Sequence, residues 1–280
     1  MVKLALIHGD CLKVLPKIPD ESIDMVLTDP PFMISKEAKI SRSRNPKKFY
    51  KYRGKDIEFF FGEWDIFDSE REYWKFTFKW LKEVWRVMRK GAHLLIFFDI
   101  FKITPLVKWV KKHDGIARQP LFWIRENPVP MARKVSFMNA VSMIFWATKH
   151  STSRKYATFN YELGQHRNYV TAPICTGNER YKYGFHPTQK PEKVCEWLIK
   201  YLSNEGDVIL DPFGGAGTTM KVARDLGRSC ITIEKDERYI EMTKRRLNWG
   251  SSLGEVEYEF LNENNVTREL FIKDSEKEED

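Results

Sequence analysis

Residues 208–219 read VILDPFGGAGTT, a short apolar run followed by a glycine-rich turn. The run predicts a buried strand, and the residues after Gly217 predict a helix that ends near Gly227. Glycines between a strand and a helix permit a tight bend and a close approach of the backbone to a ligand. A strand, turn and helix in this order are typical of parallel sheets that bind a ligand at one edge.

An acidic residue lies at the spacing from the glycines that a ligand-binding strand, turn and helix require. Glu234 follows the next apolar run, residues 230–233. An acid about 20 residues after the glycines accepts hydrogen bonds from ribose hydroxyls. No Lys-Ser or Lys-Thr pair follows the glycines, which disfavours a phosphate-binding P-loop. Turn, helix and acid together predict an adenosine-containing cofactor, and a purely structural glycine turn is the alternative.

A second motif, residues 28–32 with the sequence TDPPF, also follows an apolar run. Its two prolines exclude helix and hold the loop rigid. Asp29 is then expected at the carboxyl edge of the sheet, where ligands bind. A fixed carboxylate and a rigid carbonyl can accept both hydrogens of an amino group, and Phe32 can stack on the base that carries it. A Pro-Pro turn with an Asp cap is the alternative.

Strand-like and helix-like segments alternate along the chain. Apolar runs of strand length occupy residues 4–7, 23–27, 94–98, 141–146, 208–210 and 231–233. Helices are predicted at residues 74–88, 191–201, 218–227 and 236–247, the first preceded by a capping box at Ser69 and ended by Gly91. This alternation predicts a mostly parallel sheet covered on both faces. Residues 256–260 and 270–272 predict a terminal hairpin, and an acidic tail follows.

Charge is concentrated in one segment. The chain has 280 residues and a formal net charge of +8. Residues 33–55 contain nine basic side chains opposed only by Glu37, so this segment alone carries a charge equal to that of the whole chain. Phe49, Tyr50 and Tyr52 interleave with the charges, and aromatic rings beside basic groups favour nucleic acid. A solvated face is the alternative.

The cysteines exclude two classes of site. Cys11, Cys175, Cys195 and Cys230 form no CxxC pair and no His cluster accompanies them, so we expect reduced thiols, no disulfide framework and no metal. The N-terminus lacks the layout of a signal peptide, and no apolar run is long enough to span a bilayer. The sequence therefore predicts a cytoplasmic protein that is not in a membrane.

The motifs in this order resemble the β group of amino-methylating DNA methyltransferases, in which the catalytic loop precedes the cofactor loop. Four further segments agree with that family. They are residues 8–11 (HGDC), 85–91 (WRVMRKG), 121–128 (LFWIRENP) and 186–191 (HPTQKP). The resemblance covers residues 4–248. Phe32 stands where Tyr is more usual, which keeps stacking but removes a hydroxyl contact.

The resemblance implies an α/β fold, a Rossmann-like, seven-stranded, doubly wound methyltransferase sheet with circularly permuted motif order and a small target-recognition insertion. Residues 1–250 would form the methyltransferase domain. Residues 33–62 would be a basic DNA-contacting loop inserted in it, and residues 151–185, with His166, Arg167 and Asn168, the target-recognition region. Residues 251–280 would form the hairpin and tail. His8, His93 and the Trp74–Trp85 stripe are expected to be structural.

The resemblance also implies the site. The catalytic residues would be Asp29, Pro30, Pro31 and Phe32. S-adenosylmethionine would be the cofactor, with its methionine part near Phe213, Gly215, Gly217 and Thr218. Its ribose would lie near Glu234 and its adenine near Asp10 and Cys11. Thr188, Gln189 and Lys190 would complete the pocket, together with Asp29 and Asp211.

The implied reaction is methylation of N6 of an adenine flipped out of double-stranded DNA. Ser commonly replaces the Asp of the catalytic loop in enzymes that methylate N4 of cytosine, so Asp29 favours adenine. N4-cytosine methylation remains the main alternative. Action on RNA or on a protein amide, and a catalytically inactive DNA-binding module, are further ones. The target sequence, a partner restriction endonuclease and the choice between monomer and homodimer stay open.

Overall fold

The structure is a computed structural model that describes residues 1–33, 39–40, 57–58, 65–130, 135–150, 157–251 and 256–267. The chain divides into two compact units. The larger comprises Met1–Pro30 and Lys79–Asp280, and the smaller comprises Pro31–Phe78. The boundary falls inside helix α2 (Glu70–Val87).

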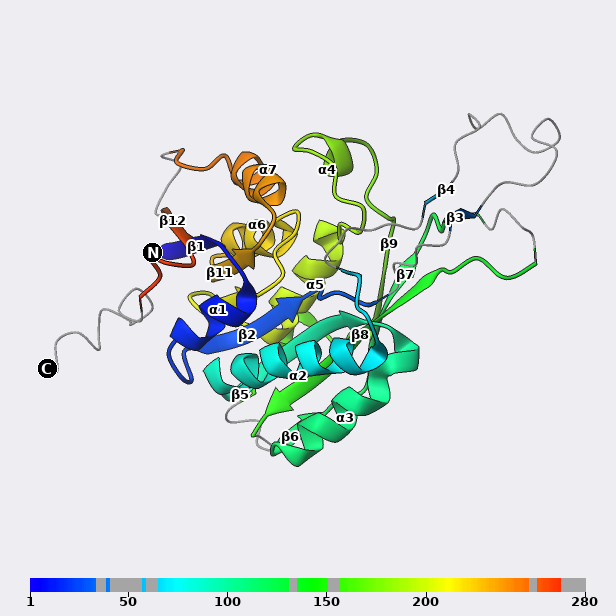
Figure 1. The fold of residues 1–280 in the computed structure, drawn as a ribbon, viewed down its shortest axis with the longest axis horizontal. Coiled ribbons are helices and arrows are strands. Elements are labelled where there is room, and N and C mark those ends of the chain that lie inside the picture. Colours follow the sequence, from blue (N-terminus) through cyan, green and yellow to red (C-terminus); the bar gives the residue numbers. More distant parts are fainter. Residues whose placement is uncertain are drawn as a thin grey trace, which may run out of the picture. The chain divides into compact units, whose positions relative to one another are not determined.

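One mixed sheet forms the centre of the larger unit (Figure 1). Its strands are β1 (Val2–His8), β2 (Ile23–Thr28), β5 (Met88–Phe98), β6 (Gly115–Ala117), β7 (Leu121–Arg125), β8 (Val141–Lys149), β9 (Tyr169–Ala172), β10 (Val208–Asp211), β11 (Ser229–Glu234) and β12 (Val256–Asn262). Their order is β12-β1-β11-β10-β2-β5-β8-β7-β9, and β6 pairs with β8. From β12 to β5 neighbouring strands are parallel, whereas β8 runs antiparallel to β5 and β7.

The predicted doubly wound sheet is confirmed, but it is wider than seven strands. Among the described residues it has ten strands, because β9 and β12 extend its two ends and β6 pairs with β8 next to β7. β9 lies in residues 151–185, which were predicted to be the target-recognition region and not part of the sheet, and pairs in parallel with β7. The strand predicted at residues 256–260 joins β1 in parallel and so extends the main sheet. Its predicted hairpin partner lies outside the described residues.

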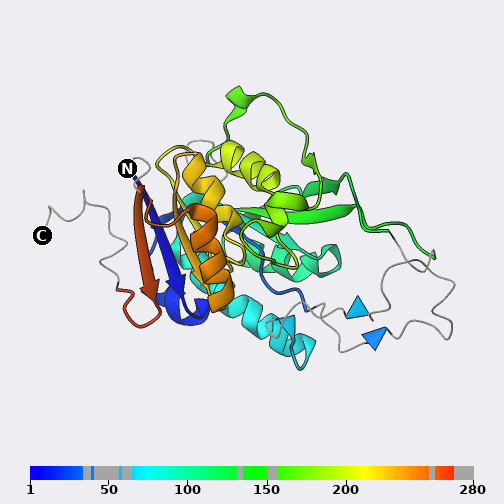
Figure 2. The same cartoon turned by 90° about the horizontal axis from the view of Figure 1, so that it is seen from above.

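Helices cover both faces of this sheet. They are α1 (Cys11–Val14), α3 (Ile103–Lys112), α5 (Glu192–Leu202), α6 (Thr218–Asp225) and α7 (Glu237–Leu247). The short helix α4 (Gly177–Tyr181) contains no buried residue. Figure 2 shows α5, α6 and α7 side by side on one face. The end of α2 lies with α3 on the other face, where Trp85 meets Trp109 edge to face with ring centroids 5.7 Å apart. The sheet and these helices bury the apolar runs between them.

The end of α2 differs from the prediction. The helix stops at Val87 and β5 begins at Met88, which pairs with Ile23 of β2. Gly91, predicted to end the helix, lies inside β5 with φ 84°. The helix therefore ends before Gly91, because the chain from Met88 onward pairs with β2. The predicted apolar stripe of α2 is confirmed at Trp85, whose side chain is buried.

The smaller unit contains a two-stranded antiparallel sheet of β3 (Lys39–Ile40) and β4 (Ile57–Glu58). Most of the predicted basic loop, residues 33–62, lies outside the described residues. Asp65 is buried and accepts hydrogen bonds from the backbone amides of Phe32 and Met33, both at 2.7 Å. This carboxylate holds the end of the Asp-Pro-Pro-Phe loop. No helix in the described ranges is both long and apolar enough to cross a membrane.

Candidate active site

Four parallel strands end at one edge of the sheet and bring separate segments of the chain together. His8 at the end of β1 lies opposite Glu234 at the end of β11, and Asp211 at the end of β10 lies opposite Thr232. β2, which ends at Thr28, pairs with β10. Most residues predicted around the cofactor end these strands or follow them directly, whereas Thr188, Gln189 and Lys190 belong to the HPTQKP segment. The sheet order therefore gathers predicted site residues from both ends of the chain.

The glycine-rich turn is shaped by what packs against it. A Cβ at Gly214 would lie 2.2 Å from Cγ2 of Thr232, so only glycine fits against β11. Gly217 has φ 72°, and a Cβ there would lie 2.5 Å from Oγ1 of Thr243 on α7. A larger residue at either position must displace the turn. Thr243 was not singled out from the sequence, because its place beside the turn depends on how α7 packs.

Glu234 reaches back to this turn. Its Oε2 accepts a hydrogen bond from the Gly215 amide at 2.7 Å, and its Oε1 accepts one from the Asp236 amide at 2.7 Å. Burial raises the pKa of Glu234 above its ordinary value. The acid predicted to bind ribose is thus beside the glycines, as the spacing requires.

Asp211 joins the two motifs. Its Oδ1 accepts hydrogen bonds from the Thr28 hydroxyl at 2.8 Å and from the Phe213 amide at 3.2 Å. The side chain is buried, and burial raises its pKa to about 6. A buried carboxylate needs such donors, because an unpaired one is strongly disfavoured. The bond to Thr28 fixes the strand end that leads into Asp29.

Asp29 is held by a residue from the HPTQKP segment. Lys190 Nζ donates to Asp29 Oδ2, and also to the Thr188 carbonyl at 3.1 Å. Only 13% of the lysine side chain and 20% of the aspartate side chain are exposed, so water screens this ion pair weakly. The sequence predicted Lys190 near the cofactor, and the structure pairs it with Asp29 of the loop predicted to be catalytic. Phe32, three residues after Asp29, belongs to the smaller unit.

The rest of the HPTQKP segment packs over the glycine-rich turn. The imidazole of His186 lies beside Gly215, and its ring centroid is 4.4 Å from that of Tyr239 on α7. Gln189 Nε2 donates to the Glu179 carbonyl at 2.8 Å. Within the described residues, Gln189 Oε1 and Thr218 Oγ1 are buried and have no hydrogen-bond partner. Both atoms therefore retain capacity to bind a polar ligand.

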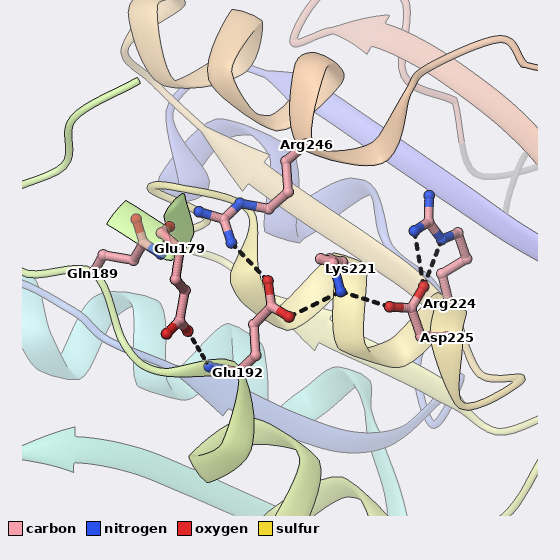
Figure 3. A network of polar contacts seen from close by, with 7 residues as sticks. All are labelled: Glu179, Gln189, Glu192, Lys221, Arg224, Asp225 and Arg246. Carbon is pink, nitrogen blue, oxygen red and sulfur yellow. Dashed lines mark hydrogen bonds and ion pairs between the residues drawn. The ribbon is translucent and has the colours of Figure 1, made fainter. Parts of the chain in front are cut away.

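A partly buried ion network lies next to this segment (Figure 3). Glu192, the first residue of α5, accepts hydrogen bonds from Arg246 Nη1 of α7 at 3.1 Å and from Lys221 Nζ of α6 at 2.9 Å. Its own amide donates to Oε1 of Glu179 at 2.8 Å. The network joins α5, α6 and α7 to the chain that carries Gln189. Sequence reasoning missed it, because the contributing residues come from four separate segments.

The loop predicted to lie near adenine follows β1. Asp10 caps α1, with Oδ1 accepting from the Leu12 amide at 2.9 Å, and its own amide donates to Glu263 Oε2 at 3.0 Å. Cys11 is buried, and burial raises the pKa of its thiol. The thiols of Cys175, Cys195 and Cys230 are also free and buried, and burial raises the pKa of the Cys175 thiol to about 12. Protonated thiols are poor nucleophiles.

Two buried histidines should make the free energy of unfolding depend on pH. Burial, followed by the charge of Lys190, lowers the pKa of His186 to about 3, and burial lowers that of His93 to about 4. Below pH about 6.5 the unfolded chain binds these protons and the folded chain does not. The free energy of unfolding should therefore fall as pH drops from about 6.5 to 4, by up to about 1.4 kcal/mol per pH unit for each histidine.

We expect His93→Gln to flatten this dependence, as measured by urea denaturation at a series of pH values. The matched control is His166→Gln, since the side chain of His166 is exposed. An unchanged slope in His93→Gln would contradict the assignment of a neutral, buried His93.

Comparison with known proteins shows the family. A sequence model of the DNA methylase family, N6_N4_Mtase, matches residues 23–245. The Type II methyltransferase M.HinfI of Haemophilus influenzae is 33% identical over 253 residues, which cover 86% of this chain and 67% of that protein.

Two solved structures share the fold. The PvuII DNA methyltransferase, described as cytosine-N4-specific, has a TM-score of 0.66 at 19% identity and covers 97% of this chain and 91% of its own. The M1.HpyAVI–SAM complex has a TM-score of 0.63 at 21% identity, and the match covers 88% of this chain and 99% of that chain. The resemblance stated from the motifs is thereby confirmed. The chain belongs to the DNA methylase family and is a DNA methyltransferase that acts on N6 of adenine or N4 of cytosine.

Proposed function

We propose that the protein methylates N6 of adenine in double-stranded DNA, with S-adenosylmethionine as methyl donor. The position of Asp29 carries the proposal. It directly follows β2, which pairs with the strand that ends at Asp211, and Lys190 holds its carboxylate. The resemblance to the family favours adenine, because enzymes that act on cytosine commonly have Ser at this position.

The residues at the sheet edge fit this cofactor. Gln189 Oε1 and Thr218 Oγ1 are buried polar atoms that a bound methionine moiety can satisfy. Glu234 stands beside the turn to accept from the ribose, and Asp10 and Cys11 take the adenine. Carboxylates along this edge favour a cationic ligand. When bound, the cofactor supplies a methyl group that its sulfonium charge already activates.

The protein's own groups then orient the base. The target base has to leave the helix stack before its amino group can be reached. Phe32 stacks on the base, while Asp29 and the Pro30 carbonyl accept hydrogen bonds from the amino group. These bonds draw the nitrogen lone pair out of conjugation and direct it at the methyl carbon. Lys190 forms an ion pair with Asp29 Oδ2, which holds the carboxylate in one orientation.

Base-resolved mapping of methylation tests the proposal. Purified protein and S-adenosylmethionine are incubated with unmethylated genomic DNA, and each modified base is identified. N6-methyladenine confined to one short motif is the expected result. N4-methylcytosine would overturn the reading of Asp29, and the absence of any methylated base would overturn the assignment to duplex DNA.

The basic segment is proposed to contact DNA phosphates. Changing Lys47, Lys48, Lys51 and Arg53 to Gln should reduce the slope of log Kd against log salt by about 0.9 for each phosphate that the variant no longer neutralises. Binding to a duplex is measured between about 50 and 200 mM salt. Changing the exposed Lys108, Lys111 and Lys112 of α3 to Gln is the control. An unchanged slope in the first variant would show that the segment is only a solvated face.

A further inference from the structure

We propose that the C-terminal strand β12 completes the cofactor site, and that Glu263 is a positioning residue that holds the loop between β1 and α1. The inference rests on the proposed function in one respect, which is the placement of the cofactor's adenine beside Asp10 and Cys11. Glu263 acts through that loop and needs no direct contact with the cofactor.

The pairing of β12 with β1 places Glu263 beside the loop between β1 and α1. β12 pairs in parallel with β1 along its whole length, from Val2 opposite Val256 to His8 opposite Asn262. Figure 2 shows β12 in red directly alongside β1 in blue. The amide of Glu263, the next residue, donates to the His8 carbonyl at 3.0 Å. Glu263 therefore stands at the edge where β1 ends and the adenine loop begins.

Both carboxylate oxygens of Glu263 are used on that loop and the helix after it. Oε2 accepts from the Asp10 amide at 3.0 Å, and Oε1 accepts from Lys13 Nζ at 2.7 Å. Lys17 Nζ adds a bond to the Glu263 carbonyl at 2.6 Å. The Asp10 amide, followed by Lys13, lowers the pKa of Glu263, so the side chain is ionised at neutral pH. One carboxylate thus fixes the backbone of the residue assigned to adenine.

The packing is close enough to need glycine in the loop. A Cβ at Gly9 would lie 2.6 Å from the Glu263 Cβ. A hollow of about 360 Å³ opens beside this contact, and Asp10, Lys235, Asn262 and Glu263 are among the residues that line it. Lys235 directly follows Glu234, the acid assigned to ribose. The end of β12 is therefore part of the wall at the adenine side of the site.

The test compares variants of Glu263 in the full chain. Glu263→Ala should bind S-adenosylmethionine about tenfold more weakly by calorimetry, because the Asp10 amide loses its acceptor. The KM for the cofactor should rise by the same factor, with kcat at saturating cofactor unchanged. Glu263→Gln keeps an acceptor oxygen and should stay within about threefold of the parent. Aspartate is one methylene shorter than glutamate, so Glu263→Asp should weaken cofactor binding as Glu263→Ala does. It replaces Glu263→Ala in the test if that variant does not fold.

A residue on the same strand gives the matched control. Glu257 also lies on β12 and forms an exposed ion pair with Lys3 at 3.6 Å, at the opposite end from the loop. Glu257→Ala should leave cofactor binding as in the parent. Cofactor binding in Glu263→Ala that equals that of Glu257→Ala would overturn the inference.

Asp10→Ala separates this inference from the proposed function. If Asp10→Ala weakens cofactor binding while Glu263→Ala does not, the role of Glu263 is wrong and the adenine placement stands. If neither variant weakens binding, the adenine placement itself is wrong.

Discussion

Replacing Asp29 with alanine is expected to lower kcat for DNA methylation by on the order of a thousandfold, while S-adenosylmethionine still binds. The carboxylate is proposed to orient the amino group of the base, an interaction that strengthens as the nitrogen attacks. The glycine-rich turn and Glu234, which are proposed to hold the cofactor, are unchanged by this substitution. Transfer of a labelled methyl group to DNA gives kcat, and calorimetry gives the cofactor Kd. Adding Phe32→Ala should abolish the remaining turnover.

The neighbouring strand supplies a matched control. Asp99 follows β5 directly, as Asp29 follows β2, and its side chain accepts from the Phe101 amide at 3.0 Å. Asp99→Ala should change kcat by no more than a few fold. If Asp29→Ala keeps a tenth or more of the parent's activity, the proposed role of Asp29 is wrong.

The second large effect concerns stability. Glu192→Ala should lower the free energy of unfolding by about 3 kcal/mol, because breaking a buried ion pair leaves an uncompensated buried charge. The Arg246 side chain has no solvent exposure, and its Nε and Nη2 have no hydrogen-bond partner among the described residues. Without Glu192, its guanidinium carbon still lies 5.5 Å from the ring of Tyr183, which carries no compensating negative charge. Urea denaturation at neutral pH measures the change.

Glu196 on the same helix shows what an exposed pair contributes. It forms an ion pair with Lys200, four residues on, and both side chains are 45% exposed. Such pairs contribute about 0.5 kcal/mol or less, so Glu196→Ala should hardly change the urea midpoint. Equal losses in the two variants would show that burial of Arg246 contributes nothing to the effect.

The site comes together at a single sheet edge, and this explains why residues from distant motifs act as one unit. Asp29, Asp211 and Glu234 follow adjacent parallel strands. The HPTQKP segment covers the turn from the other side through His186 and reaches Asp29 through Lys190. The hydrogen bond from Thr28 to Asp211 and the ion pair of Lys190 with Asp29 thus connect segments that are far apart in the chain.

The sequence by itself determined the features that obey local rules. Buried strands show as apolar runs, and the glycines after residue 210 and the prolines after Asp29 impose turns whatever surrounds them. The predicted strands and helices therefore appear where expected. The rule that glycine ends a helix failed at Gly91, because the chain already pairs with β2 as a strand from Met88 onward. Local rules also failed at β9, whose pairing with β7 stabilises residues without an apolar rhythm.

The tertiary structure alone decided which side chains meet. Lys190 and Asp29 are 161 residues apart, Thr28 and Asp211 are 183 apart, and Glu263 and Asp10 are 253 apart. No local pattern encodes these pairs, because each depends on the order in which the strands join the sheet. Strand order is set by the burial of whole faces, which sums weak contributions from many residues. The types of residue in the site could therefore be predicted from the sequence, whereas the partners of Asp29, Asp211 and Glu263 required the fold.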